Sequence, residues 1–331
     1  MKVIIQIPCL NEEETLPATL ADLPRTIPGV DEVETLVIDD GSTDRTVEVA
    51  QECGVDHIVK LPNNRGLATG FQAGLDAALK LGADVIVNTD ADNQYSGADI
   101  PKLVAPILAG EAEMVVGDRG VADIEHFSPS KKALQKLGSW VVRQLSDTDV
   151  TDATSGFRAY NREAALQLLV VDNFTYTLES LIQAGKGSVA VGDVPIGTNP
   201  KTRESRLFGS TSAYVRKNGL AILRIYTRYE PLKVFSLLGL VAALAALGAW
   251  MPFLVDWIAN GDRDGHIQSL LLGAVLFIVA IQLFALGIIG DLLAGQRVMT
   301  QRVYERVRRI ELQLDVEPSH RVEPARDRST V

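Results

Sequence analysis

Residues 85–94 read VIVNTDADNQ, a short apolar strand followed at once by a loop rich in carboxylates. β-Branched residues bounded by polar ones are typical of a buried strand. Three earlier apolar runs, at residues 3–7, 34–38 and 57–61, also end in polar loops. Helical patterns at residues 13–23, 43–53 and 66–81 separate these runs. This alternation predicts a parallel sheet covered on both faces, with ligands beyond the carboxyl ends of its strands.

Composition and charge exclude several classes of protein. The chain has 331 residues, 47% of them hydrophobic, which is enough for a sizeable core. Its net charge of -10 disfavours a general nucleic-acid binder, because phosphate contacts need an excess of Lys and Arg. The two cysteines, Cys9 and Cys53, cannot form a disulfide framework or a four-ligand zinc site. Neither a dinucleotide fingerprint nor a Gly-Lys-Ser/Thr phosphate loop is present in the sequence.

The acidic loop after residues 85–88 is a candidate metal site. In an extended segment residues i and i+2 share a side, so Asp90, Asp92 and Gln94 are expected to face one cation together. Oxygen ligands suit Mg²⁺ or Mn²⁺, with water and substrate phosphates completing the shell. A calcium hand is excluded because its glycine and closing glutamate are missing. The alternative interpretation is an acidic surface turn.

Two further polar clusters follow predicted strands. The first, PCLNEE at residues 8–13, offers backbone N–H groups and acceptors to a ligand, or is simply a helix cap with Asn11 as N-cap. The second, DDGSTD at residues 39–44, carries carboxylates able to accept bonds from a base or a ribose. Taken alone, each pattern favours a common turn or cap.

The fourth cluster combines DATSGFR at residues 152–158 with the upstream Arg119 and with TRESR at residues 202–206. Eight cations and two acids lie between Lys201 and Lys233, in an otherwise acidic protein. Such a stretch beside a membrane is able to hold a lipid phosphate. The alternative is that these charges serve only membrane orientation and attraction to anionic lipid.

The C-terminal third contains two runs typical of membrane spans. Residues 234–255 carry no charge and, at about 1.5 Å per residue, reach roughly 33 Å. Residues 267–290 form a second uncharged run. The alternative is a buried helical hairpin in a soluble protein.

Flanking charges predict the orientation of these spans. Five cations precede the first span and five follow the second, whereas the connector is mainly acidic. The positive-inside rule therefore places the N-terminal domain and both termini in the cytoplasm, in an integral protein of the cell membrane with two spans. The N-terminus also lacks the pattern of a signal peptide. We expect a domain at 1–213, a juxtamembrane amphipathic segment at 214–233, a two-helix hairpin at 234–293 and, at 294–331, a cytoplasmic helix whose tail is disordered beyond about Leu314.

Six motifs follow one another along the chain in this order: IPCLNEEE, VIDDGSTD, DADNQ, VVGDR, DATSGFR and TRESR. Together they resemble family 2 glycosyltransferases, and more closely the polyprenyl-phosphate branch that includes dolichol-phosphate mannosyltransferase. The resemblance covers about residues 1–230, and the two apolar runs are similar to the membrane anchor of some members. It implies a GT-A nucleotide-sugar-binding domain, an α/β fold with a mostly parallel central sheet, followed by two transmembrane helices.

The resemblance also implies roles for single residues. The donor is expected at Pro8, Asn11, Glu12, Asp39, Asp40 and Asp90, and the metal at Asp90, Asp92 and Gln94. The acceptor phosphate is expected at Arg203 and Arg206. The residues implied to take part in the reaction itself are Asp92, Arg119 and Asp152.

The resemblance implies an inverting, metal-dependent hexosyltransferase. It would move one hexose from a GDP-mannose or UDP-glucose type donor to a polyprenyl or dolichyl phosphate at the cytoplasmic face. The implied cofactor is Mg²⁺ or Mn²⁺. The implied partners are the nucleotide-diphosphate sugar, the polyprenyl phosphate and the membrane. A homo-oligomer is left open by the resemblance. Transfer to another lipid or a growing glycan is the alternative activity. A processive synthase is disfavoured because no Gln-x-x-Arg-Trp segment is present, and a non-catalytic membrane adaptor is the alternative of a different class.

Overall fold

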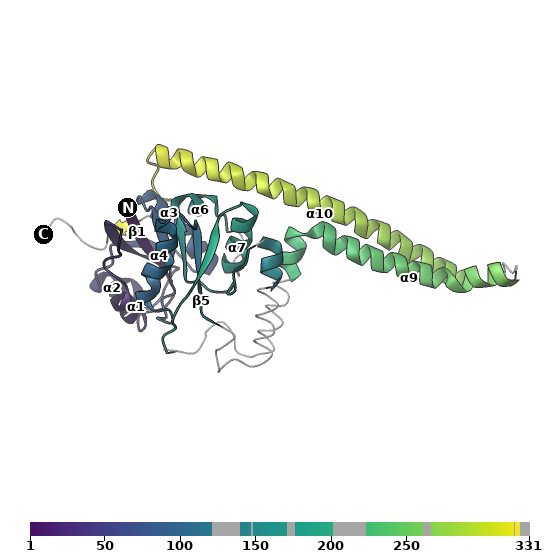
Figure 1. The fold of residues 1–331 in the computed structure, drawn as a ribbon, viewed down its shortest axis with the longest axis horizontal. Coiled ribbons are helices and arrows are strands. Elements are labelled where there is room, and N and C mark those ends of the chain that lie inside the picture. Colours follow the sequence, from purple (N-terminus) through teal and green to yellow (C-terminus); the bar gives the residue numbers. More distant parts are fainter. Residues whose placement is uncertain are drawn as a thin grey trace. The chain divides into compact units, whose positions relative to one another are not determined.

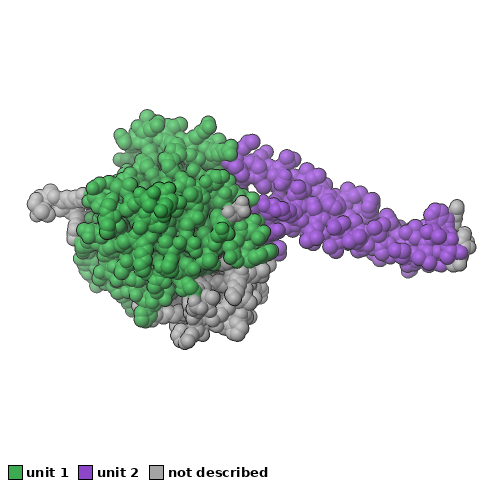
Figure 2. Space-filling model, in the orientation of Figure 1, with its two compact units in different colours: residues 1–221, 301–331 green, residues 222–300 purple. Residues whose placement is uncertain are grey.

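The computed structural model describes residues 1–120, 140–146, 148–170, 176–200, 223–260, 266–320 and 322–324. The chain divides into two compact units, which Figure 2 shows in different colours. Unit 1 comprises residues 1–221 and 301–331, and unit 2 comprises residues 222–300. The predicted boundary after residue 213 stays a prediction, since residue 213 and the first division both fall among residues outside the described part of the chain. The predicted boundary at 294 differs slightly, because the last turns of the final helix belong to unit 1.

Unit 1 is built on one sheet with the strand order β7-β5-β6-β4-β1-β2-β3-β8. Its central strands β4, β1, β2 and β3 are parallel, and β5 is parallel to β7, while β6 and β8 pair antiparallel with their neighbours. This confirms the prediction of a mostly parallel sheet. The strands are β1 (Lys2–Cys9), β2 (Glu32–Asp39), β3 (His57–Lys60), β4 (Val85–Asn88), β5 (Met114–Asp118), β6 (Arg158–Asn161), β7 (Val191–Pro195) and β8 (Val322–Pro324).

Alternating side chains of β1 fill both layers of the core. Val3, Ile5 and Ile7 join a buried cluster with residues of α1, α2 and α4. Gln6 lies on the other face, where a side chain at Gly74 of α3 would come within 2.5 Å of its Oε1 atom. Helices therefore cover both faces of the sheet, as Figure 1 also shows. The helices of unit 1 are α1 (Leu16–Asp22), α2 (Thr46–Glu52), α3 (Leu67–Lys80), α4 (Ile100–Leu108), α6 (Arg162–Gln167) and α7 (Tyr176–Lys186), with a 3-10 turn at Gly97–Asp99.

The observed element boundaries differ most from the predicted ones at the starts of helices. The strand predicted over residues 3–7 continues to Cys9, because Pro8 remains in register with Ile38 of β2. The helix predicted from Glu13 begins at Leu16, and the helix predicted from Thr43 begins at Thr46. Asn11 is not an N-cap; its φ of 56° places it in the left-handed region. The N-cap of α1 is instead Thr15.

Unit 2 contains α9 (Pro231–Asn260) and most of α10 (Ile267–Gln313), and both are long and apolar enough to cross a membrane. Only 11% and 17% of the residues in their most apolar windows are buried. Such exposure contradicts the alternative of a buried hairpin in a soluble protein. The helix α10 also continues well past the predicted end of the span at Gly290.

The C-terminal segment folds back onto unit 1. The sequence predicts disorder beyond about Leu314, whereas β8 pairs antiparallel with β3 and closes the free edge of the sheet. Before it, the backbone N–H and Oγ of Ser319 each donate to Asp76 of α3 over 2.8 Å. Lys80 of α3 also donates to the Glu317 carbonyl. Residues 325–331 lie outside the described part of the chain.

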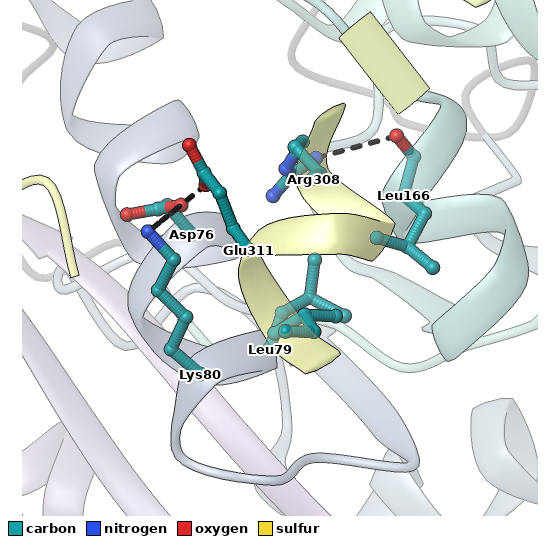
Figure 3. Close-up of a pocket in the computed structure, with 7 residues that line it drawn as sticks. Asp76, Leu79, Lys80, Leu166, Arg308 and Glu311 are labelled. Atoms are coloured by element: carbon teal, nitrogen blue, oxygen red, sulfur yellow. Dashed lines mark hydrogen bonds and ion pairs between the residues drawn. The ribbon is translucent and has the colours of Figure 1, made fainter. Parts of the chain in front are cut away.

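The end of α10 packs between α3 and α6 (Figure 3). Arg308, only 3% exposed, donates from Nη1 to the Ala165 carbonyl over 2.9 Å. Glu311 pairs with Lys80 over 3.2 Å. The space among these side chains is too narrow to admit a water molecule, so it is a packing seam and not a ligand site. The residues that line it are Asp76, Leu79, Lys80, Leu166, Arg308, Glu311 and Leu312.

Replacing Arg308 with alanine should lower the free energy of unfolding by about 2–4 kcal/mol, since it removes buried packing and leaves buried carbonyls without a donor. Arg309 is the matched control, because its ion pair with Glu163 is exposed and Arg309→Ala should cost less than about 1 kcal/mol. Thermal unfolding of the full chain in detergent measures both. Equal destabilisation by the two variants would contradict the packing of this segment.

Candidate functional site

The sheet topology brings the sequence clusters to one edge. Parallel strands β1, β2 and β4 end at Cys9, Asp39 and Asn88, so the loops after them share the carboxyl edge. The strand β5 pairs antiparallel with β6, which pairs antiparallel with β4, so β5 also ends at this edge. Because β6 runs the opposite way, the loop before it arrives there too. The carboxyl edge therefore gathers the loops that carry the sequence clusters, as expected. These are residues 8–13, 39–44, 90–94, 118–119 and 152–157.

The loops after β1 and β2 are joined by reciprocal hydrogen bonds. The Asn11 N–H donates to Ser42 Oγ over 2.9 Å, and the Thr43 N–H donates to Asn11 Oδ1 over 2.8 Å. The Glu12 N–H donates to Thr46 Oγ1 over 2.8 Å. Asn11 therefore fastens the two loops together, which explains why it does not cap a helix.

Two carboxylates line this part of the edge. Glu12, 8% exposed, accepts the Thr15 hydroxyl over 2.7 Å. Asp39, at the end of β2, accepts the Ser42 N–H over 2.9 Å. Both are buried, as is Pro8 in β1.

Asp40 fixes the loop that leads into α3. Its two oxygens accept the N–H groups of Arg65 over 2.7 Å and Gly66 over 2.9 Å. Gly41 has a φ of +77°, and a Cβ there would lie 2.6 Å from the Asn63 and Asn64 backbone. A glycine is required for this close approach. Asp40 thus shapes the wall of the site.

The metal candidates lie on a turn, which corrects the prediction of an extended segment. Residues 91–93 form a turn, and Asn93 has a φ of 54°. Gln94 reaches back within this turn, donating from Nε2 to Asp92 Oδ2 over 2.8 Å and from its backbone N–H to Asp92 Oδ1 over 3.2 Å. The side chains of Asp90 and Asp92 are only partly buried. The turn, and not strand alternation, brings these residues together.

The two aspartates repel one another. Burial, followed by the charge of Asp92, raises the pKa of Asp90 to about 7. Glu12 adds to this rise, whereas the guanidinium of Arg119 opposes it. A cation between the carboxylates would relieve the repulsion, so the donor set fits a hard divalent ion. Among the residues that the structure describes, there is no group of three or more His, Cys, Asp or Glu side chains that could hold a metal ion. Such an ion would therefore depend on Gln94, water or substrate oxygens for its other ligands.

Arg119 and Asp152 form a bidentate ion pair. Arg119 Nε donates to Asp152 Oδ2 over 2.6 Å, and Nη2 donates to Asp152 Oδ1 over 3.0 Å and to Thr154 Oγ1 over 2.9 Å. Burial alone would raise the pKa of Asp152, but the ion pair and the Thr154 hydroxyl hold it below its usual value. The side chain of Asp152 is 2% exposed and that of Arg119 is 21% exposed, so Arg119 is the more accessible member of the pair.

The sequence patterns assign no role to several residues of the site. Asn88, at the end of β4, donates from Nδ2 to the Gly156 carbonyl over 2.8 Å and accepts from Gln6 over 2.9 Å. Tyr95 Oη accepts the Gly156 N–H over 3.0 Å. Arg158 is fully buried beneath the same loop. A polar residue inside an apolar strand, as at Gln6, is the signal that marks such buried networks.

The predicted acceptor residues Arg203 and Arg206 lie outside the described part of the chain, as do residues 214–222 of the predicted juxtamembrane segment at 214–233. The remaining predicted residues are gathered at the carboxyl edge. They comprise Pro8, Asn11, Glu12, Asp39, Asp40, Asp90, Asp92, Gln94, Arg119 and Asp152.

Residues 4–169 match the family model described as glycosyl transferase family 2. Glycosyltransferase AglJ of Haloferax volcanii is 27% identical over 314 residues, covering 92% of this chain and 97% of the relative. Polyprenol monophosphomannose synthase of Mycolicibacterium smegmatis is 28% identical over 221 residues, covering 63% of this chain and 82% of the relative.

A solved structure shares the fold. The glucosyl-3-phosphoglycerate synthase of Mycobacterium tuberculosis, in complex with Mn²⁺, uridine diphosphate and phosphoglyceric acid, superposes with a TM-score of 0.52. It is 22% identical, and the match covers 67% of this chain and 78% of that one. The domain is therefore GT-A-like, as predicted.

Proposed function

This chain belongs to glycosyl transferase family 2, and we propose that it transfers one hexose from a nucleotide-diphosphate sugar to a polyprenyl phosphate, with inversion at the anomeric carbon. The observation that carries the proposal is the shared carboxyl edge of the sheet. The Asp90–Asp92 turn, the loops holding Asn11 and Asp39, and the Arg119–Asp152 pair all lie there. The name of the mycobacterial relative supports the acceptor class.

The donor would bind between the loops after β1 and β2, with its diphosphate toward the aspartates. We assign Pro8, Asn11, Glu12 and Asp39 to the nucleotide pocket, whose wall Asp40 fixes. Asp90, Asp92 and Gln94 would hold Mg²⁺ or Mn²⁺. When bound, such an ion stabilises the negative charge that develops on the diphosphate leaving group.

The acceptor phosphate would approach the guanidinium of Arg119. One phosphate oxygen forms a bond to the anomeric carbon while the bond from that carbon to the diphosphate breaks, and the nucleoside diphosphate departs with the electron pair. A phosphate is already ionised at neutral pH, so it needs positioning and charge neutralisation more than a base. Asp152 would keep Arg119 oriented, and Arg203 and Arg206 would add further contacts to phosphate.

The two apolar helices would anchor this chemistry at a membrane. Their flanking cations support a cytoplasmic position for the catalytic domain and both termini. A polyprenyl chain is confined to the bilayer, so an anchored enzyme meets it without leaving the surface.

A test of the acceptor is to incubate purified full chain with undecaprenyl phosphate, Mn²⁺ and a panel of nucleotide sugars, and to analyse the lipid by mass spectrometry. We expect a single added hexose with one donor. Free phosphoglyceric acid serves as the competing soluble acceptor. Transfer to that acid alone would reject the lipid phosphate.

Proton competition at Asp90 predicts a pH dependence of metal binding. Because its pKa is raised to about 7, lowering the pH protonates this ligand in the folded protein. The affinity for Mn²⁺ with uridine or guanosine diphosphate should fall by about tenfold per pH unit below about 7. Calorimetric titrations between about pH 5.5 and about pH 7.5 measure this slope. Asp90→Asn should bind weakly without that slope, and an unchanged slope in the variant would contradict the assignment.

A further inference from the structure

Beneath the proposed site lies a fully buried arginine, Arg158, at the start of β6. Its donors all point to neutral oxygens in the contacts that the structure describes. Nε donates to the Ser155 carbonyl over 2.7 Å, and Nη2 donates to the Ala153 carbonyl over 2.8 Å. Nη1 donates to the Thr177 carbonyl over 2.7 Å and to Ser180 Oγ over 2.9 Å, both on α7.

These bonds hold one loop to one helix. Thr154 lies between Ala153 and Ser155, whose carbonyls bind Arg158. Its hydroxyl accepts a hydrogen bond from Arg119 and donates one to Asp152, each over 2.9 Å. The next residue, Gly156, is fixed at its carbonyl by Asn88 and at its N–H by Tyr95. The backbone around Thr154 is therefore fastened from below, where Arg158 lies, and from the side of β4.

The same loop leaves no space beside Asp90. A Cβ at Gly156 would lie 2.8 Å from Tyr176 Oη and 3.2 Å from Asp90 Oδ1. A small shift of this loop would therefore change two things at once: the direction of the Arg119 guanidinium and the surroundings of Asp90.

We propose that Arg158 is a positioning residue, which touches no substrate and sets the orientation of Arg119 by clamping the 152–156 loop to α7. A buried charge is costly, and replacing it with an apolar side chain would be expected to serve stability equally well. The fork of a guanidinium supplies what an apolar residue cannot, namely donors in fixed directions to four oxygens on two segments. The inference deepens the proposed function and rests on it for the role of Arg119.

The test is a double-mutant cycle on the full chain with Arg158→Lys and Arg119→Lys. Arg158→Lys keeps the charge but loses the fork, so kcat should fall about tenfold or more while the KM for the donor changes less than about twofold. In the Arg119→Lys background the same change should cost less than about twofold, because the loop then has no guanidinium to orient. Equal losses of kcat in both backgrounds would overturn the proposal, as would a fully active Arg158→Lys.

Two further variants distinguish the proposed effect from a general folding defect. Arg162→Lys changes an arginine that also donates to a carbonyl, that of Ala83 over 3.1 Å, at the opposite end of β6, and should leave kcat unchanged. Ser180→Ala removes one acceptor of Arg158 and should lower kcat by about twofold to fivefold. A loss in Arg162→Lys as large as that in Arg158→Lys would also overturn the proposal.

Hydrogen exchange of the peptide spanning residues 150–157 separates this inference from the proposed function. Arg158→Lys should speed exchange at this peptide, whatever reaction the enzyme catalyses, because the Gly156 N–H depends on the clamped loop. If wild-type protein glycosylates no lipid phosphate but the exchange result holds, the proposed function fails and the clamp stands. Unchanged exchange in Arg158→Lys would reject the clamp itself.

Discussion

Replacing Asp92 with asparagine is expected to lower kcat/KM for sugar transfer by about three orders of magnitude, the usual effect of removing a group that stabilises developing charge. The substitution keeps the size of the side chain but removes a charge from the turn. Gln94, which donates to Asp92 over 2.8 Å, then loses its anionic partner. Initial rates over a series of Mn²⁺ concentrations measure the loss.

The variant should not lose stability in the absence of metal. The charge of Asp92 raises the pKa of Asp90, so removing it relieves repulsion. The matched control is Asp56→Asn, just before β3 at the opposite edge of the sheet, where Asp56 accepts the Thr35 N–H over 2.9 Å. That control should retain activity within about twofold. Full activity of Asp92→Asn at saturating Mn²⁺ would contradict the metal assignment.

Arg119→Ala should cost both activity and stability. It leaves Asp152, 2% exposed, without the partner that holds its pKa low. Breaking a largely buried ion pair from one side is expected to cost about 2–4 kcal/mol, allowing for the partial exposure of Arg119. The loss of the guanidinium should also lower kcat/KM by about 10²–10³-fold. Thermal unfolding in detergent and steady-state rates measure the two effects.

A double variant separates these two effects. Arg119→Met with Asp152→Asn removes both charges, so it should recover most of the lost stability while activity stays low. Asp149→Asn, at an exposed position three residues before Asp152, is the control for the second substitution. If the double variant regained wild-type activity, the pair would be a structural feature only, and Arg119 would have no part in binding phosphate.

The strand at Val85–Asn88 could be predicted residue by residue because an apolar, β-branched run bounded by polar residues is a local signal. The starts of α1 and α2 could not. The N–H groups of Asn11, Glu12 and Thr43 bind side chains of the other loop, and these partners lie about thirty residues away. A local capping pattern carries no information on such bonds.

The C-terminal strand shows the same limit. The three residues Val322–Pro324 have no strand signal of their own and pair only because β3 leaves a free edge. For the site, the order of motifs predicts which loops meet, and the structure confirms their common edge. The sequence does not predict the turn at Asp90–Gln94 or the clamp by Arg158, since both depend on side chains that contact distant backbone.

The most direct test of the account is the formation of a glycosylated polyprenyl phosphate by the purified full chain in nanodiscs, with and without Mn²⁺. The account predicts that one nucleotide sugar yields a lipid carrying a single hexose, and that chelating the metal stops the reaction. Formation of a polymer, or unchanged turnover after chelation, would contradict it. So would the absence of any glycosylated lipid across the donor panel.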